Sequence, residues 1–248
     1  MVARILFAFL LLCSVSADAA NEDAESILRT VDGYRMPFAG MAIHVDARTR
    51  DSSGVEARSY SVAFQDQVNT LVAFNSPPTN EDDLVLMSGD DIWFYAQDTR
   101  KPIRITPMQR LSGAVSYGDI ARLSWSHDYD VVTMAEDTLG GEPVTKLDLE
   151  AKTRGATYQA ITVWTEQTTY RPLKAEVYLA SGKHFKTMTF TDFAMVEGKE
   201  INTEMTIVDH LNSDGSSQLT FSDIASRSWP NRLFIRTGLP DIDPAELR

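Results

Sequence analysis

The distribution of apolar and polar residues divides the chain into one helical segment and a long series of short strands. Over residues 21–34 the apolar side chains recur at helical spacing, which predicts an amphipathic helix. Asn21 is suited to the N-cap, and Gly33 followed by Pro37 is typical of a helix end. From Gly40 onward the apolar residues recur at every second position, which is the pattern of a β-strand with one covered face.

About eleven stretches show this alternation or a short apolar run, and turn residues such as the Gly140-Gly141 pair separate them. They lie around residues 41–45, 60–64, 71–74, 84–87, 92–95, 103–105, 147–149, 175–179, 188–190, 201–207 and 219–221. A looser stretch in the middle contains Asp119 followed by apolar residues, which predicts a short helix. A large antiparallel meander of this kind protects its edges and its apolar face by curling into a closed or half-closed barrel.

One stretch departs from the alternation. Ile92, Trp93, Phe94 and Tyr95 stand side by side, so both faces of this strand require cover. One alternate pair would face the barrel interior and the other would lie under a lid helix or loop. The sequence leaves open which pair is which.

The first nineteen residues predict a cleaved secretory signal. An apolar run follows Arg4, and a small-residue Ala-Asp-Ala sequence ends at Ala19, as expected before a signal-peptidase cut. The apolar run is shorter than the roughly 20 residues that span a bilayer. We therefore expect residues 1–19 to be removed and residues 20–248 to form one exported, periplasmic domain without cysteine.

The charge of the chain restricts its partners. With 23 basic and 35 acidic residues, the formal net charge is −12. Nucleic acid would be repelled, and an anionic membrane surface would also repel the chain taken as a whole. We expect a monomer that binds no nucleic acid.

The residue types that carry catalysis do not form a recognisable set. None of the four histidines lies near a G-x-S-x-G turn, and the glycines form no phosphate-binding loop. Asp90-Asp91 and the acidic triplet 81–83 suit turns beside strands better than a hydrolase pair. The polar stretch 127–130 suits a turn better than a metal site. We expect no catalytic residue, no metal and no cofactor.

Three segments, taken in order, resemble the outer membrane lipoprotein-sorting family, the LolA-like periplasmic carriers. The first is "FNSPPTNEDDLVLMSGDDIWFYAQDTRKPIRI" at 74–105, with its Ser-Pro turn and aromatic step. The second is "GAVSYGDI" at 113–120. The third is "YRPLKAEVYLASGKHFKTMTFTDF" at 170–193, where a Ser-Gly-Lys hairpin precedes a Lys-Thr strand. Their order, over residues 24–240, carries the resemblance.

The resemblance implies a mainly β fold, a single antiparallel unclosed half-barrel of about eleven strands, with the N-terminal helix and short middle helices as a lid. Its cargo would be the acyl chains of a lipoprotein or lipid, passed from an inner-membrane exporter to an outer-membrane acceptor. The apolar residues expected to line the cavity are Met41, Ile43, Phe64, Phe74, Met87, Trp93, Tyr95, Trp164, Met188, Phe190, Met205 and Phe221. The residues expected in the lid are Ile27, Leu28, Val31, Tyr117 and Ile120.

In the family, a strand arginine ties the lid helices down by hydrogen bonds. Arg58 is the candidate by position, on the strand phase that it shares with Tyr60 and Val62. The segment around Gly113 departs from the family pattern, because Ala114 and Val115 stand where an acidic residue often occurs.

Two other functions fit the same features. A protein of this fold can sense a lipid or lipoprotein and regulate a membrane signalling or export system. A hydrolase that uses Asp90 and Asp91 is the enzymatic alternative.

Overall fold

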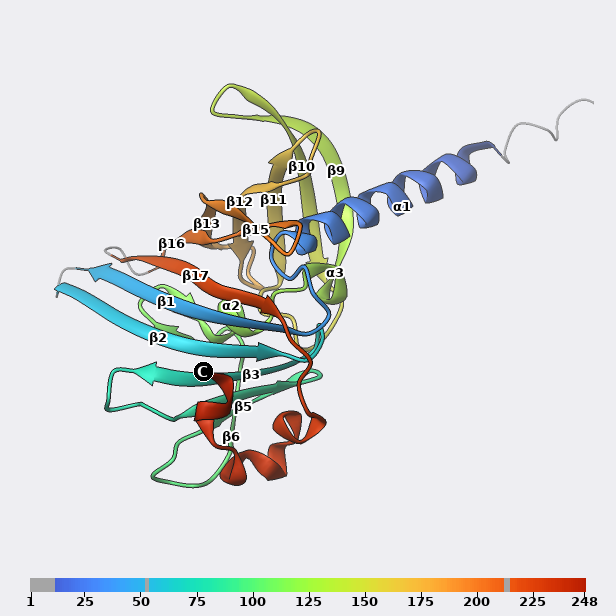
Figure 1. Ribbon diagram of the computed structural model, residues 1–248. Coiled ribbons are helices and arrows are strands. Elements are labelled where there is room, and N and C mark those ends of the chain that lie inside the picture. The colour runs from blue at the N-terminus through green and yellow to red at the C-terminus, as the bar shows by residue number, and fades with distance from the viewer. Residues whose placement is uncertain (1–11, 52–53, 212–214) are drawn as a thin grey trace, which may run out of the picture.

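The computed structural model shows one large curved antiparallel sheet with helices on its concave side (Figure 1). The structure describes residues 12–51, 54–211 and 215–248. Helix α1 (Leu12–Gly33) ends at Gly33 as the sequence predicts, but it begins earlier than expected. Residues 1–11 of the predicted signal lie outside the described residues, and cleavage after Ala19 stays a prediction.

Thirteen strands of the described chain form the sheet, in the order β6-β5-β4-β3-β2-β1-β17-β16-β13-β12-β11-β10-β9. Their bounds are β1 Met41–Asp51, β2 Gly54–Phe64, β3 Asn69–Ser76, β4 Leu84–Ser88, β5 Asp91–Tyr95, β6 Ile103–Ile105, β9 Tyr129–Leu139, β10 Glu142–Ala151, β11 Ala160–Glu166, β12 Pro172–Tyr178, β13 His184–Phe190, β16 Glu204–Asp209 and β17 Ser216–Ser226. Two separate hairpins consist of β7 (Arg110–Ser112) with β8 (Val115–Ser116), and β14 (Phe193–Val196) with β15 (Lys199–Asn202).

The sheet is an unclosed half-barrel, which confirms the predicted fold class. Pairing of β1 with β17 joins two meanders at the middle of the sheet. Strands β6 and β9 stand at opposite ends of the strand order and do not pair with each other. The sheet therefore has two free edges among its described strands, one at β6 and one at β9.

The strand count exceeds the expected eleven because β9 and β11 lack alternation in the sequence. Most of β9 after Val131 is exposed on both faces, so its residues do not alternate. In β11, Ile161, Thr162 and Val163 are all buried, because both faces of this strand are covered. Alternation of apolar and polar residues indicates a strand only when one of its faces is buried and the other is exposed to solvent.

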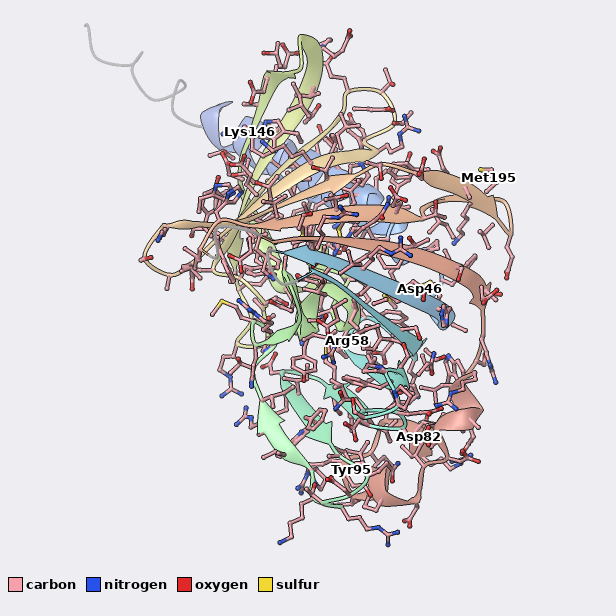
Figure 2. All side chains as sticks on the ribbon, turned by 90° about the vertical axis from the view of Figure 1, so that its left-hand side faces the viewer. Asp46, Arg58, Asp82, Tyr95, Lys146 and Met195 are labelled. Atoms are coloured by element: carbon pink, nitrogen blue, oxygen red, sulfur yellow. The ribbon has the colours of Figure 1, made fainter. Side chains whose placement is uncertain are left out.

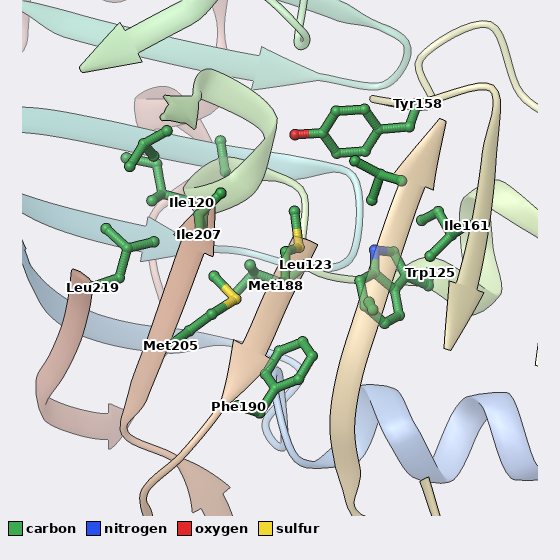
Figure 3. Packing of buried hydrophobic residues seen from close by; sticks show 14 of the residues in the cluster. Ile120, Leu123, Trp125, Tyr158, Ile161, Met188, Phe190, Met205, Ile207 and Leu219 are labelled. Atoms are coloured by element: carbon green, nitrogen blue, oxygen red, sulfur yellow. The ribbon is translucent and has the colours of Figure 1, made fainter. Parts of the chain in front are cut away.

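Three helices cover the concave face. Helices α2 (Tyr117–Ala121) and α3 (Trp125–Asp128) follow the β7–β8 hairpin, and with α1 they contribute apolar side chains to one core. Figure 3 shows Ile120, Leu123 and Trp125 packed toward side chains of β13 and β16. The concave side of the half-barrel is therefore occupied by the protein's own buried side chains.

The convex face also has a cover from the C-terminal end of the chain, over strands β1 to β5. Three short 3₁₀ turns, η1 (Asn231–Phe234), η2 (Arg236–Asp241) and η3 (Pro244–Leu247), pack there in a second core. The segment that covers the outer side of β5 thus comes from the C-terminal end of the chain. None of the described helices is long and apolar enough to cross a membrane.

These two cores determine the orientation of the aromatic strand β5. Ile92 and Phe94 belong to the concave core, whereas Trp93 and Tyr95 belong to the convex core under the C-terminal turns. The guanidinium of Arg236 lies 4.8 Å from the centre of the Trp93 ring. The expectation that Trp93 and Tyr95 line the interior is wrong, because a segment more than a hundred residues away covers them.

Candidate functional site

A small cavity lies between the concave face of the sheet and the segment that follows α1. Its lining residues are Arg35, Met41, Ile43, Leu123, Phe190, Ile201, Asn202, Met205, Phe221 and Ile224. The cavity measures about 20 Å³, which is room for about one water molecule. Sites for small organic ligands are larger, roughly 300–1,000 Å³. This cavity is therefore too small to hold an acyl chain.

The lining is apolar and adaptable. It comes from the inward phases of β1, β13, β16 and β17, together with the hairpin strand β15 and the lid. Met41 and Met205 face this space, and unbranched thioether side chains change shape at little cost. These two side chains can change rotamer when the lid moves, whereas the three isoleucines of the lining are stiffer.

Arg35 is the charged group of this lining, and it is bonded to the lid. Its Nη1 donates to the carbonyl oxygen of Leu123 at 2.7 Å, and its guanidinium lies 3.7 Å from the centre of the Trp125 ring. Burial lowers the pKa of Arg35 to about 10, and the neighbouring Asp32 opposes this shift. The arginine remains charged at neutral pH.

Asp32, in the last turn of α1, connects α1 to α3. Its carboxylate accepts hydrogen bonds from the backbone N–H groups of Trp125 and Ser126, both at 2.8 Å, and from the Ser124 hydroxyl at 3.0 Å. Burial raises the pKa of Asp32, while Arg35 and the hydrogen bonds lower it. These bonds join the two helices so closely that they would move together.

Lys186 ties the middle helix α2 to the sheet. From the concave side of β13, its Nζ donates to Ser116 Oγ at 2.6 Å and to Asp119 Oδ2 at 3.0 Å. Tyr158 donates to the other oxygen of Asp119 at 2.6 Å, and burial raises the pKa of Tyr158 well above its usual value. Lys186 is 1% exposed and Asp119 is 3% exposed. We call Lys186, Ser116 and Asp119 the lid latch.

A third contact holds α3 against the turn between β4 and β5. Arg122 pairs with Asp128 through two hydrogen bonds, and its Nη1 donates to the carbonyl oxygen of Gly89 at 2.8 Å. The same nitrogen lies 3.4 Å from Met87 Sδ, which places Met87 beneath the lid. Opening the half-barrel therefore requires the separation of several buried charged groups.

The structure sorts the predicted cavity residues into three groups. Met41, Ile43, Phe190, Met205 and Phe221 line the cavity. Phe64, Phe74 and Met188 lie in the packed concave core, and Met87 contacts the lid arginine. Trp93, Tyr95 and Trp164 point away from the interior, and the Trp164 indole donates to Asp137 Oδ2 at 2.9 Å on the outer side. Placing these three residues in the cavity was wrong.

The predicted lid residues lie on the helices. Ile27, Leu28, Val31 and Ile120 are buried in the concave core, and Tyr117 is half-buried against it. The described side-chain hydrogen bond of Arg58 goes to Glu56 Oε1 of its own strand, at 2.8 Å from Arg58 Nε, so its role as a lid latch stays a prediction. Arg58 is the fifth residue of β2 and is half-buried, two residues before the buried half of the strand begins at Tyr60 (Figure 2 labels Arg58).

Sequence reasoning missed Arg35, Lys186 and Asp119 as the lid contacts. The sequence nevertheless contains a signal for Lys186, which shares the inward phase of β13 with Met188 and Phe190. A charged residue on an apolar phase indicates a buried partner. Asp119 stands in the segment "GAVSYGDI" that carries part of the family resemblance.

Comparison with known proteins identifies the family to which the chain belongs. A family model described as an uncharacterized protein matches residues 66–241. Among solved structures, a LolA superfamily protein from Nitrosomonas europaea is 31% identical, with a TM-score of 0.81 over 86% of this chain and 98% of its own. The chain belongs to the LolA superfamily. No curated protein matches it significantly.

More distant LolA-like structures show the same fold. An outer membrane lipoprotein-sorting protein domain from Vibrio parahaemolyticus is 18% identical, with a TM-score of 0.74 over 89% of this chain and 99% of its own. A DUF1329 family protein from Desulfovibrio piger is 16% identical, with a TM-score of 0.74 over 88% of this chain and 98% of its own. Among the described residues of this LolA superfamily member, no three His, Cys, Asp or Glu side chains come together as a metal site.

Proposed function

We propose that this protein is a periplasmic carrier that binds the acyl chains of a lipoprotein or lipid inside the half-barrel and moves them toward the outer membrane. The observation that carries the proposal is the mostly apolar cavity, with Met41 and Met205 in its lining, under a lid that buried polar contacts hold shut. The LolA superfamily membership supports it. An inner-membrane exporter and an outer-membrane acceptor would be the partners.

The energetics favour such a mechanism. Transfer of an acyl chain out of water yields about 0.8 kcal/mol per CH₂ group, so a chain of about sixteen carbons gains roughly 12 kcal/mol. Displacing the lid costs part of this, because the latch groups lose their buried partners. The measured affinity is reduced by the rarity of the open form. A receptor that stabilises the open form would release the cargo.

Native mass spectrometry of the protein purified from bacterial periplasm tests the proposal directly. We expect co-purified lipid, and uptake of a fluorescent fatty acid by the ligand-free protein. A protein that is always ligand-free and takes up no fatty acid would contradict a carrier function. A protein that binds lipid but never passes it to acceptor vesicles would favour the lipid-sensing alternative.

A brominated fatty acid locates the bound chain. Trp125 is buried on the concave side next to Arg35 and Phe190, whereas Trp164 lies on the convex side. In two variants that each retain a single tryptophan, Trp125 or Trp164, with the other three replaced by phenylalanine, we expect bromine to quench Trp125 and to leave Trp164 unaffected. Equal quenching of the two would place the ligand outside the half-barrel.

A further inference from the structure

A row of apolar side chains leads from the concave core to the free edge of the sheet. Tyr60 and Phe74 are fully buried, with ring centres 5.0 Å apart, and Phe94 follows at 6.1 Å from Phe74. Phe94 is half-buried, and its partner in the register of β6 is Ile103, which is 57% exposed. Exposure thus rises along the row from the interior to solvent.

The helix side of this row is only partly covered. The Tyr117 ring of α2 lies 6.5 Å from the Phe94 ring, and both rings are half-buried. Ile105 of β6 is half-buried on the same face, and Met108 in the following loop is 41% exposed. Because β6 is the last strand of the sheet, no described strand covers the end of the row.

The same edge is basic, although the whole chain carries a net charge of −12. The segment 98–110 contains four basic residues and one acidic residue, Asp98. Its basic side chains are all exposed: Arg100, Lys101, Arg104 and Arg110. Arg104 pairs with Asp91, and Arg110 lies 3.9 Å from Asp209. Arg100 and Lys101 form no ion pair among the described residues, so the local positive charge of this segment lies beside Ile103.

We infer that the β6 edge docks on an anionic phospholipid surface, with Ile103 entering the headgroup layer and the surrounding basic side chains binding phosphates. We define this docking edge as Arg100, Lys101, Ile103 and Arg104. The apolar row behind it then connects the membrane to the concave core, and acyl chains enter along it. The entry route rests on the proposed carrier function, whereas the docking itself does not.

Charge screening reconciles this docking with an acidic chain. The field of a charged membrane falls off within about 8–10 Å at physiological ionic strength. Carboxylates on distant parts of the molecule therefore add little repulsion once the edge touches the surface. The expectation that an anionic membrane repels the chain considers only its total charge, and local charge at the point of contact decides the outcome. An acidic protein partner could also pair with the basic side chains of the edge. Unlike a membrane, it would not supply acyl chains at the end of the apolar row.

Sedimentation with vesicles tests the docking. We expect the full chain to bind vesicles of phosphatidylglycerol and phosphatidylethanolamine, and not vesicles of phosphatidylcholine alone. A basic residue near an anionic surface contributes about five-fold in binding, so Arg100→Glu with Lys101→Glu should weaken it by about 25-fold or more. The matched control is Arg29→Glu with Lys183→Glu, an equal charge change at exposed sites on α1 and on the turn between β12 and β13. Its binding should change by less than about three-fold.

A second pair of variants tests the apolar contact. Ile103→Asp should lower vesicle binding by about ten-fold, because it replaces an inserted side chain by a repelled one. Met195→Asp introduces the same charge at an apolar side chain that is 67% exposed on the distant β14–β15 hairpin (Figure 2). This control should bind as the unmodified chain does. Circular dichroism and thermal melting establish that each variant is folded.

The outcomes separate the docking from the carrier function. Equal binding to anionic and neutral vesicles would overturn the docking, and so would equal losses in the edge and control variants. Absence of fatty-acid uptake by a chain that still binds anionic vesicles would overturn the carrier function and the entry route, and would leave the docking intact. Binding to an acidic peptide instead of vesicles would replace the membrane by a protein partner.

Discussion

The latched part of the lid and the β6 edge are two contrasting ends of the same concave face. At the latch, Lys186 and Asp119 are buried together, and the charged groups bond to neighbouring side chains. At the edge, Phe94 and Tyr117 are half-buried, and Ile103 is largely exposed. The first region resists opening because a separated buried ion pair is strongly unfavourable. The second requires no such separation to admit a ligand.

This difference indicates how a closed half-barrel can still exchange an acyl chain. Local openings of a protein begin where few apolar contacts and few buried polar bonds must break. The β6 edge meets that description, whereas the latch and the Asp32 contacts do not. We expect opening to start at the edge and to spread toward the latch as the ligand replaces the lid's apolar contacts.

The largest expected effect is at the latch. Lys186→Met leaves the Asp119 carboxylate buried without its cation, and we expect a loss of about 3–5 kcal/mol in the free energy of unfolding. The double variant Lys186→Met with Asp119→Leu removes both charges and should recover most of this loss. Urea unfolding of the single and double variants measures the difference. A double variant as unstable as the single one would show that packing, rather than the unpaired charge, is responsible.

The two ends should also differ when a phenylalanine is truncated. Phe190 is 5% exposed beside the cavity, and Phe190→Ala should lower the free energy of unfolding by about 3–5 kcal/mol. Phe94→Ala removes a half-buried ring and should lower it by roughly half as much. Equal losses measured by urea unfolding would contradict the distinction between a packed interior and an open edge.

The sequence predicts the class of fold well because periodicity reports which strands have one covered face. It also identifies the methionines and aromatics of the inward phases of β1, β13, β16 and β17. It does not orient β5, because all four of its apolar residues find cover. Residues 229–248 cover Trp93 and Tyr95. The sequence around β5 contains no pattern that predicts this long-range packing.

The lid contacts were harder to predict for a related reason. Arg58 and Lys186 both occupy the inward phase of a strand, so their residue type and phase do not distinguish them. Arg58 lies in the middle of β2, where the exposed half of the strand meets the buried half, whereas Lys186 is buried beside Met188 and contacts Asp119. Only the position of α2 over the sheet decides which cation is buried.

A smaller effect is expected from pH at the α1–α3 contact. Burial raises the pKa of Asp32 above the 3.8 of a free carboxyl. At a pH between the unfolded-state and folded-state pKa values, the folded protein therefore binds a proton that the unfolded chain has released. This contribution to stability is complete below about pH 4 and is lost as the pH rises through the folded-state pKa. In urea unfolding between pH 4 and pH 7, the wild type should lose stability relative to Asp32→Asn as the pH rises, by at most about 1.4 kcal/mol per pH unit. A difference that is constant over this range would contradict the raised pKa.

The smallest expected effect is at the docking edge itself. Ile103→Ser removes an apolar side chain that is 57% exposed, and substitutions of exposed residues usually change the free energy of unfolding by less than about 0.5 kcal/mol. Thermal melting should therefore scarcely distinguish this variant from the wild type, although its binding to anionic vesicles should fall. A loss above about 1 kcal/mol in the free energy of unfolding would mean that Ile103 stabilises the fold. Its apolar character would then be explained by packing, without a membrane. A variant that keeps the wild-type stability but loses vesicle binding identifies its residue as a docking residue rather than a core residue.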